Sequence, residues 1–526
     1  MSAHQHDHGP SLRPHCCPCS EPLEAAGGPL TRRGFLGGMG GAALGGVALT
    51  GLSWPLLAAA EAQAEPPPAR RPLVVKPILV YDIPGRRPQT SWRSWGGIQT
   101  QEQADEEVAR IKGELDKLQA AADFPVKFLP VTATRRGQGL DAAAEDMTAC
   151  DVVLLYAAGS GMAACDAALK LGKDVIYFVR HKSGPVYLWY EIVSPRYLRQ
   201  HTDQLALKGI CDQDVVVDSQ PEILWRLRSL CGLRNTLGTK IIAVGGAGAW
   251  AQPRGVVPDL VRKLFQFDIQ VVPYNELGKL IKAAREDQAA VQLAKQRADE
   301  YLKIPQTTLE TKREFVDNAF LLEQVFRGLM KQAGCRAITI NSCMGTIMPM
   351  SQTTACLPLS LLNDAGYLAF CESDFVVIPA GVLLANIAGR PMFLNDPTYP
   401  HEGLITLAHC TAPRKLDGQT PEPARILTHF ESDYGAAPKV EMRKGQKVTN
   451  IVPDFAFKRW VGVSAEIVEA PFLPICRSQI DVRFPCDSLK LAERMPGFHW
   501  MTIYGDWLRE AGYALRRIPI EWECLG

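Results

Sequence analysis

Several features that mark other classes of protein are missing from this 526-residue sequence. After residue 64, no apolar run is long enough to cross a bilayer, which argues against an integral membrane protein. The formal net charge is +1 and no block of lysine and arginine stands out there, so a nucleic-acid-binding function is not indicated. The cysteines after residue 64 form no C-x-x-C pair, which makes a zinc ribbon or a disulfide framework unexpected.

A nucleotide-binding fingerprint is also missing. The glycine-rich stretch that follows the apolar segment KIIAV places glycine at positions 245, 246 and 248, which does not complete G-x-G-x-x-G. No acid stands at the end of a following strand, where a ribose partner would be needed. We therefore predict a tight strand-to-helix turn at this point rather than a dinucleotide site.

The first 64 residues predict an export signal. Thr31-Arg32-Arg33-Gly34-Phe35-Leu36 matches the twin-arginine pattern, and Ala62-Gln63-Ala64 is an A-x-A cleavage site. We expect residues 1–64 to engage the twin-arginine export machinery and then to be removed, the alternative being a retained N-terminal anchor. The mature protein would be periplasmic or extracellular, with no stable membrane anchor, and residues 65–72 would form a proline-rich linker.

Alternation of apolar segments and amphipathic segments dominates the chain from residue 73 to residue 400. Apolar strands such as LVVKPILVY are followed by helical patterns, two of which begin with capping boxes, Thr100 with Gln103 and Thr311 with Glu314. Such alternation predicts parallel sheets covered by helices. From residue 401 onward, short alternating segments separated by glycine and proline predict antiparallel β structure. The expected fold class is α/β, with two doubly wound domains (73–236 and 237–400) followed by a β-rich C-terminal domain (401–526).

Polar groups with metal-binding chemistry gather between Cys371 and Cys410. Glu372 and Asp374 precede an apolar run, and Asp396 and His409 each end a short strand. Acids and a histidine suit a divalent metal that prefers oxygen and nitrogen ligands. The alternative is that the acids cap a helix and that His409 is a hydrogen-bonded core residue.

The order of this stretch resembles the L-fucose isomerase and L-arabinose isomerase superfamily. Four segments carry the resemblance, in the family's order: Glu372-Ser373-Asp374, Asn395-Asp396-Pro397-Thr398-Tyr399, Phe498-His499-Trp500 and Arg517-Ile518-Pro519-Ile520. The resemblance implies two α/β domains and a β-rich domain, a homo-oligomer, and a metal-dependent enzyme. Its expected reaction is the interconversion of an aldose and a ketose through an enediol, with a small sugar as the substrate.

By the same resemblance, Asp374 and His499 are expected to bind the metal, and Asp374 and Glu372 to be catalytic. The family's upstream metal-binding glutamate has no counterpart in the segment Pro349–Cys356, which holds no acid. Glu372 or His409 would then complete the site, and Mn²⁺ is expected because no cysteine accompanies these ligands in the sequence. The missing glutamate keeps open a non-catalytic sugar-binding or assembly protein, and a different enediol or aldol-type metal enzyme also remains possible.

Two further segments are candidates for sugar binding. The loop after the first strand carries Arg87, Trp92 and Arg93 between glycines, and guanidinium donors with an indole face suit a sugar. Arg477 lies between two β segments and could serve the same purpose. The alternatives are a loop packed on the sheet edge and an ordinary surface arginine.

Overall fold

The computed structural model describes residues 66–525 apart from 93–96, 160–161 and 188–192, and its contacts divide the chain into two units. The first unit contains residues 73–122 and 126–224, and the second contains residues 225–526 with the short segments 66–72 and 123–125. Helix α8 (Gln220–Thr236) crosses the boundary between them. Within the described part of the chain, no helix is both long enough and apolar enough to cross a membrane. The twin-arginine motif and the cleavage site lie outside the described residues.

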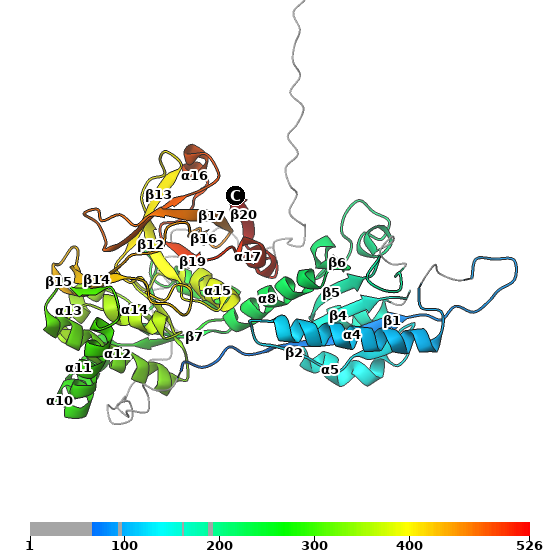
Figure 1. The fold of residues 1–526 in the computed structure, drawn as a ribbon, viewed down its shortest axis with the longest axis horizontal. Coiled ribbons are helices and arrows are strands. Elements are labelled where there is room, and N and C mark those ends of the chain that lie inside the picture. Colours follow the sequence, from blue (N-terminus) through cyan, green and yellow to red (C-terminus); the bar gives the residue numbers. More distant parts are fainter. Residues whose placement is uncertain (1–65, 93–96, 160–161, 188–192, 526) are drawn as a thin grey trace, which may run out of the picture. The chain divides into compact units, whose positions relative to one another are not determined.

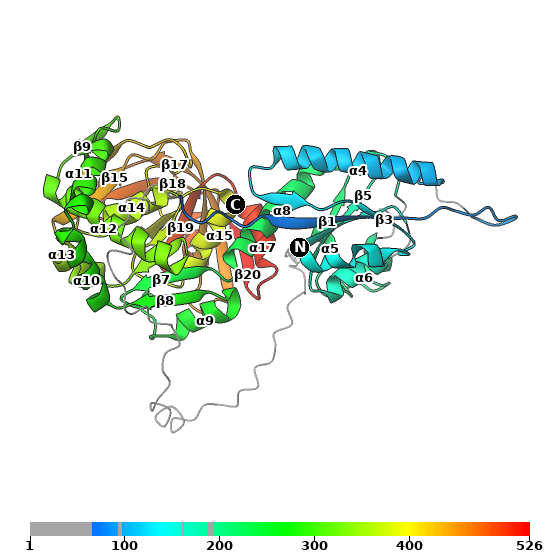
Figure 2. The same cartoon turned by 90° about the horizontal axis from the view of Figure 1, so that it is seen from below.

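A parallel sheet forms the first unit, in the order β2-β1-β4-β5-β6, with β3 also paired to β1. Helix α4 lies on one face of this sheet, and α5 and α6 lie on the other (Figure 2). The strands β1 and β4 are almost wholly buried because helices cover both faces, which explains their continuous apolar sequence. The bounds are β1 Leu73–Tyr81, α4 Gln101–Ala121, β2 Val126–Phe128, β3 Thr132–Arg135, α5 Ala144–Ala149, β4 Val152–Ala157, α6 Ala163–Lys170, β5 Asp174–Val179 and β6 Val215–Val217.

A second parallel sheet opens the second unit, in the order β11-β10-β7-β8. The helices that follow its strands pack with it into one apolar core. The bounds are β7 Lys240–Val244, α9 Val256–Phe265, β8 Asp268–Val272, α10 Tyr274–Glu286, α11 Gln288–Leu302, α12 Arg313–Ala333, β10 Ala337–Ile340, α13 Met348–Ser351, α14 Cys356–Asp364, β11 Leu368–Phe370 and α15 Ile378–Ala388.

The rest of the second unit is built around a barrel-like sheet (Figure 1). Its strands run β16-β19-β12-β13-β18-β17, β17 pairs back to β16, and β20 adds to β17 in parallel. Alternate residues point into an apolar interior that includes Leu407, Val461 and Trp500. The bounds are β12 Phe393–Pro397, β13 Leu404–His409, β16 Lys447–Pro453, β17 Arg459–Glu469, β18 Ser478–Arg483, α16 Ser488–Arg494, β19 Trp500–Tyr504, α17 Leu508–Leu515 and β20 Glu521–Leu525.

The expected mixture of parallel α/β layers and a β-rich part is confirmed in this coarse form. The barrel begins at β12 (Phe393), earlier than the expected boundary at residue 400, because β12 pairs with β13 and β19. A three-stranded sheet, β15-β14-β9, also joins the two parts; its bounds are β9 Thr307–Leu309, β14 Ala424–His429 and β15 Tyr434–Val440. One apolar core runs from residue 233 to residue 520, so the second sheet and the barrel share a single unit.

The two predicted helix caps differ in outcome. The Thr100 side chain accepts a hydrogen bond from the backbone N–H of Gln103, as predicted for the start of α4. The capping box at Thr311 was wrong. The Thr311 hydroxyl donates instead to the carbonyl of Gly435 at 2.9 Å, and α12 begins two residues later without a side-chain cap. Thr311 therefore bonds to β15 and not to the start of α12, a contact that sequence spacing does not reveal.

Candidate metal centre

The candidate site lies at the carboxyl ends of three adjacent parallel strands, β7, β10 and β11. Glycine-rich turns and polar residues leave the sheet at these ends, as is usual for sites in α/β proteins. Glu372 and Asp374 follow β11 directly, and the turn after β7 reaches them because the N–H of Phe375 donates to the carbonyl of Gly248 at 3.1 Å. The barrel supplies the remaining groups: Asp396 in β12, and two histidines at the ends of β13 and β19.

Backbone strain marks the segment that carries the acids. Glu372 and Ser373 both adopt left-handed conformations, with φ of 62° and 50°. Non-glycine residues pay about 1 to 3 kcal/mol each for such conformations, which persist where surrounding contacts enforce them. Here the Ser373 hydroxyl donates to the carbonyl of Gly246 at 2.9 Å. The strained pair turns the chain so that Glu372 and Asp374 both reach toward the same histidine.

That histidine is His499, which is buried and held by Asp374. Its Nδ1 lies 2.6 Å from Oδ2 of Asp374, and both side chains are at most 2% exposed. The other oxygen of Asp374 accepts hydrogen bonds from the backbone N–H groups of Trp250 and Val376, each at 3.1 Å. A carboxylate in this position fixes both the tautomer and the orientation of the ring, so that Nε2 is the nitrogen left for a ligand.

Two further carboxylates surround Nε2 of His499. Oδ1 of Asp396 lies 3.0 Å from it and Oε2 of Glu372 lies 3.3 Å from it. Nε2 of His499 and Oδ1 of Asp396 are nevertheless both buried without a hydrogen-bond partner. Neighbouring ligand atoms around an octahedral ion stand about 3 Å apart, which follows from metal–oxygen distances of about 2.1 Å. Both distances from Nε2 of His499 are of this size. The three residues nevertheless do not form a group whose ligand atoms all lie within 4.8 Å of one another, so a shared cation would require Asp396 and Glu372 to move closer together.

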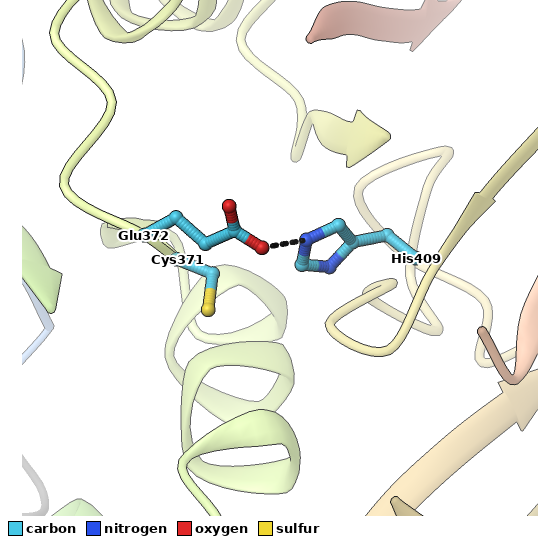
Figure 3. Close-up of side chains that lie close together, drawn as sticks. All are labelled: Cys371, Glu372 and His409. Carbon is cyan, nitrogen blue, oxygen red and sulfur yellow. Dashed lines mark ion pairs between the residues drawn. The ribbon is translucent and has the colours of Figure 1, made fainter. Parts of the chain in front are cut away.

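A second histidine, His409, faces the carboxylate of Glu372 (Figure 3). Its Nε2 lies 3.6 Å from Oε1 of Glu372, and its Nδ1 lies 3.0 Å from the Thr411 hydroxyl. Cys371, His409 and Glu372 place their ligand atoms within 4.8 Å of one another. Glu372 therefore lies between the two histidines, with Oε1 toward His409 and Oε2 toward His499. Its side chain is 42% exposed.

Charge in the site follows from this packing. Burial alone would lower the pKa of His499, but the hydrogen bond to Asp374 and the nearby carboxylates of Asp396 and Glu372 raise it to about 12. The pKa of His409 is also raised, since Glu372 and Asp396 outweigh the effect of burial. Burial would raise the pKa of Glu372, yet the two histidines hold it well below its usual range. Metal binding by these histidines would require unprotonated ring nitrogens, so it would be coupled to proton release.

The geometry bears on two of the expected metal ligands. Asp374 already receives three hydrogen bonds and supports His499, so its predicted role as a ligand stays a prediction. Asp396 was named among the polar groups of this stretch but not in the expected ligand set, and it lies 3.0 Å from the free nitrogen of His499. Cys371 lies beside Glu372 and His409, so the premise that no cysteine accompanies the ligands does not hold, and the expected preference for Mn²⁺ loses one of its reasons.

An aromatic pair beside His499 was missed by the sequence analysis. The rings of Trp250 and Phe498 stack with centroids 4.1 Å apart and planes 19° apart, and Trp250 is 42% exposed. Trp250 also lies edge-on to His499, with centroids 6.4 Å apart. The signal that could have found it is its position, because Trp250 closes the glycine-rich turn after a buried parallel strand.

The predicted sugar-binding residues lie in different parts of the chain. Arg87 is exposed and, like Trp92, belongs to the first unit, while Arg93 lies outside the described residues. Arg477 lies in the second unit, but its guanidinium donates to the carbonyl and the hydroxyl of Thr428, at 2.7 and 3.1 Å. Sugar binding by these residues remains a prediction.

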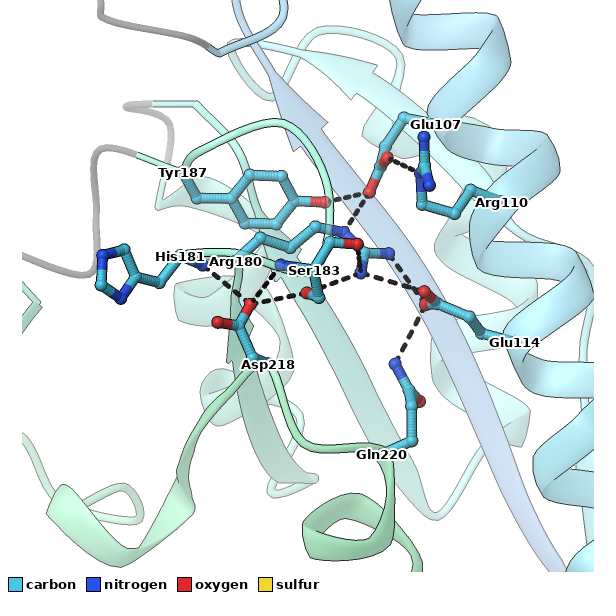
Figure 4. Close-up of polar contacts among 9 residues, drawn as sticks. All are labelled: Glu107, Arg110, Glu114, Arg180, His181, Ser183, Tyr187, Asp218 and Gln220. Carbon is cyan, nitrogen blue, oxygen red and sulfur yellow. Dashed lines mark hydrogen bonds and ion pairs between the residues drawn. The ribbon is translucent and has the colours of Figure 1, made fainter.

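A second polar cluster lies in the first unit, at the end of β5 (Figure 4). Arg180 is fully buried and forms ion pairs with Glu107 at 2.6 Å and Glu114 at 2.8 Å. Tyr187 donates to the same oxygen of Glu107, and Asp218 accepts hydrogen bonds from the turn that follows Arg180. Arg180 is balanced by two glutamates, and Asp218 is held by backbone N–H groups. Because these buried or partly buried charges have partners, the cluster indicates a structural role.

Comparison with protein-family models and with curated sequences found no match. The resemblance to sugar isomerases therefore stays an expectation based on the segments named above, and the site's geometry is the basis for any functional conclusion.

Proposed function

We propose that this protein is a metal-dependent sugar isomerase that interconverts an aldose and a ketose through an enediol. One observation carries the proposal: the buried, unpartnered Nε2 of His499 faces carboxylate oxygens of Asp396 and Glu372 at 3.0 and 3.3 Å. A site of two carboxylates and one imidazole leaves coordination positions open, which an isomerase needs for two oxygens of the sugar.

In this proposal, Glu372, Asp396 and His499 hold a divalent cation, for which Mn²⁺ is the candidate. When bound, the ion would stabilise the negative charge that develops on the sugar's carbonyl oxygen. Asp374 keeps the proton of His499 on Nδ1, which leaves Nε2 free. Glu372 is the proposed proton acceptor, because it is the most accessible carboxylate of the group and His409 lies 3.6 Å from it.

Trp250 is the proposed platform for the sugar ring. Its exposed indole stacks on Phe498 and so presents a fixed aromatic face beside the carboxylates. Carbon-bound hydrogens of a sugar pack well on such a face while its hydroxyl groups remain free for polar partners. We also propose that the protein works outside the cytoplasm and as a homo-oligomer.

Metal analysis followed by a substrate screen tests the proposal. The purified protein, its His499→Gln and Asp396→Asn variants, and an Asp259→Asn control would be loaded with Mn²⁺, washed and assayed for bound metal. Asp259 is a suitable control because it is 68% exposed and pairs only with Arg262 in its own helix. We expect metal in the wild type and the control, a sharp loss in both site variants, and interconversion of at least one aldose–ketose pair by the wild type.

Other results of these assays would favour a different function. Bound metal without any aldose–ketose conversion would favour a different enediol or aldol-type reaction. Sugar binding without metal would favour a non-catalytic sugar-binding protein, the alternative raised by the lack of an acid in the segment Pro349–Cys356.

A further inference from the structure

Three cysteine side chains from separate parts of the second unit pack against one another. Cys356 begins α14, Cys410 follows the last residue of β13, and Cys476 precedes β18. Cys356 and Cys410 are buried together with Ala437, and the partly buried Cys476 packs against them. The thiols of Cys356 and Cys476 both lie close to the thiol of Cys410. No role in the candidate metal centre requires this grouping.

The three sulfur atoms form a row rather than a metal cage. Among described residues, the one group of three whose ligand atoms all lie within 4.8 Å is Cys371, Glu372 and His409. Since Cys410 contacts both of the other thiols, the wider separation must be between Cys356 and Cys476. A central sulfur with a neighbour on each side suits thiol–disulfide exchange, in which one thiolate displaces another from a shared sulfur.

We propose that Cys356, Cys410 and Cys476 form a thiol–disulfide relay, in which a disulfide made between Cys410 and Cys476 near the surface passes to Cys356 and Cys410 in the core. The oxidant is a small or protein-borne disulfide, RS–SR. The thiolate of Cys476, the most accessible of the three, attacks RS–SR to give Cys476–S–SR and RS⁻. The thiolate of Cys410 then displaces a second RS⁻, so the two cysteines lose two electrons and two protons, and two RSH form.

Transfer into the core completes the relay without further oxidation. The thiolate of Cys356 attacks the sulfur of Cys410, a Cys356–Cys410 disulfide forms, and the thiolate of Cys476 leaves. The relay is next to the candidate metal centre in the sequence. Cys410 lies between His409 and Thr411, and the Thr411 hydroxyl lies 3.0 Å from Nδ1 of His409. Oxidation therefore ties the segment that positions His409 to α14. The relay itself does not depend on bound metal or on isomerase activity.

Peptide mapping after mild oxidation tests the relay. The folded, metal-free protein would be incubated with glutathione disulfide, its remaining thiols alkylated, and its peptides mapped by mass spectrometry. We expect the loss of two alkylatable thiols per chain and a cross-linked peptide joining Cys410 to Cys476 early and to Cys356 later. A Cys335→Ala control should behave as the wild type, because Cys335 is buried beside Ala337, away from the three cysteines.

Single variants separate the steps. Cys356→Ala should stop at the Cys410–Cys476 disulfide, and Cys476→Ala should slow the formation of Cys356–Cys410. Cys410→Ala should leave Cys476 carrying glutathione and form no internal bond. A wild type that takes glutathione on Cys476 but never cross-links Cys410 would overturn the proposal, as would a direct Cys356–Cys476 bond in the Cys410→Ala variant. If Cys410→Ala fails to fold, the disulfides mapped in the wild type and in Cys356→Ala still show whether the relay exists.

Discussion

Replacing Asp374 by asparagine tests how the candidate centre is held. One oxygen of Asp374 accepts two backbone N–H groups, from Trp250 and Val376, and the other accepts Nδ1–H of His499. An asparagine offers only one oxygen, so its amide group must face a donor on one side or the other. If the oxygen keeps the two backbone groups, the amide faces Nδ1 of His499. The ring proton then moves to Nε2 and points at Glu372 and Asp396, where a cation would bind.

The size of the effect follows from this geometry. Loss of a carboxylate that orients a metal-binding histidine lowers metal affinity by about 10- to 100-fold, which is about 1.4 to 2.7 kcal/mol. The metal-free Asp374→Asn variant should also unfold more easily, by about 1.5 to 3 kcal/mol, because a buried charge-assisted hydrogen bond is lost. Calorimetric titration with Mn²⁺ and urea unfolding measure the two quantities. The exposed Asp259→Asn control should change neither.

A clear result would refute the reasoning. If Asp374→Asn folds as the wild type does and binds Mn²⁺ with a dissociation constant within about twofold of it, Asp374 does not control His499, since the expected loss is at least about tenfold. The ion would then lie elsewhere, and the proposed isomerase would lose its main support.

Three further predictions follow from named contacts. Trp250→Ala should raise KM for the sugar about 2- to 13-fold, as the loss of an aromatic face worth about 0.5 to 1.5 kcal/mol implies, and leave Mn²⁺ affinity unchanged; weaker metal binding would contradict the platform role. Burial raises the pKa of Asp364 to about 6, above its unfolded value, so its ionisation destabilises the fold as pH rises from about 4 to 6. In urea unfolding, Asp364→Asn should therefore be more stable than the wild type at pH 7.5, by about 1 to 3 kcal/mol, and equal to it near pH 3.5. Glu107→Gln, which leaves Arg180 with one buried partner fewer, should cost about 3 kcal/mol in thermal or urea unfolding, against under about 1 kcal/mol for the half-exposed Arg110→Ala.

The sequence predicted the architecture well because its signals are local. Apolar strands alternate with helices from residue 73 to about residue 390, and short alternating segments follow, so the coarse division into parallel layers and a β-rich part could be predicted. The cap at Thr311 was wrong because its hydroxyl bonds to Gly435, 124 residues away. No periodic pattern reports such a contact.

The candidate site was predicted only in part, for the same reason. Asp374 and His499 were both selected, and the structure places them 2.6 Å apart. Which acid faces the free nitrogen depends on the strained turn at Glu372 and on the pairing of β12 with β19, which brings Asp396 to His499. Trp250 gave no sequence signal beyond its place after a strand.

The union of the second sheet and the barrel in one core has a consequence for the order of events in a cell. Asp374 and His499 are separated by 125 residues, and the sheet supplies one while the barrel supplies the other. The proposed cation site is therefore complete only when nearly the whole chain has been made and folded, and an early fragment lacks part of the donor set. The twin-arginine route expected from the leader carries proteins that are already folded. On that route the ion would be chosen from the metals of the cytoplasm, before the protein meets those outside.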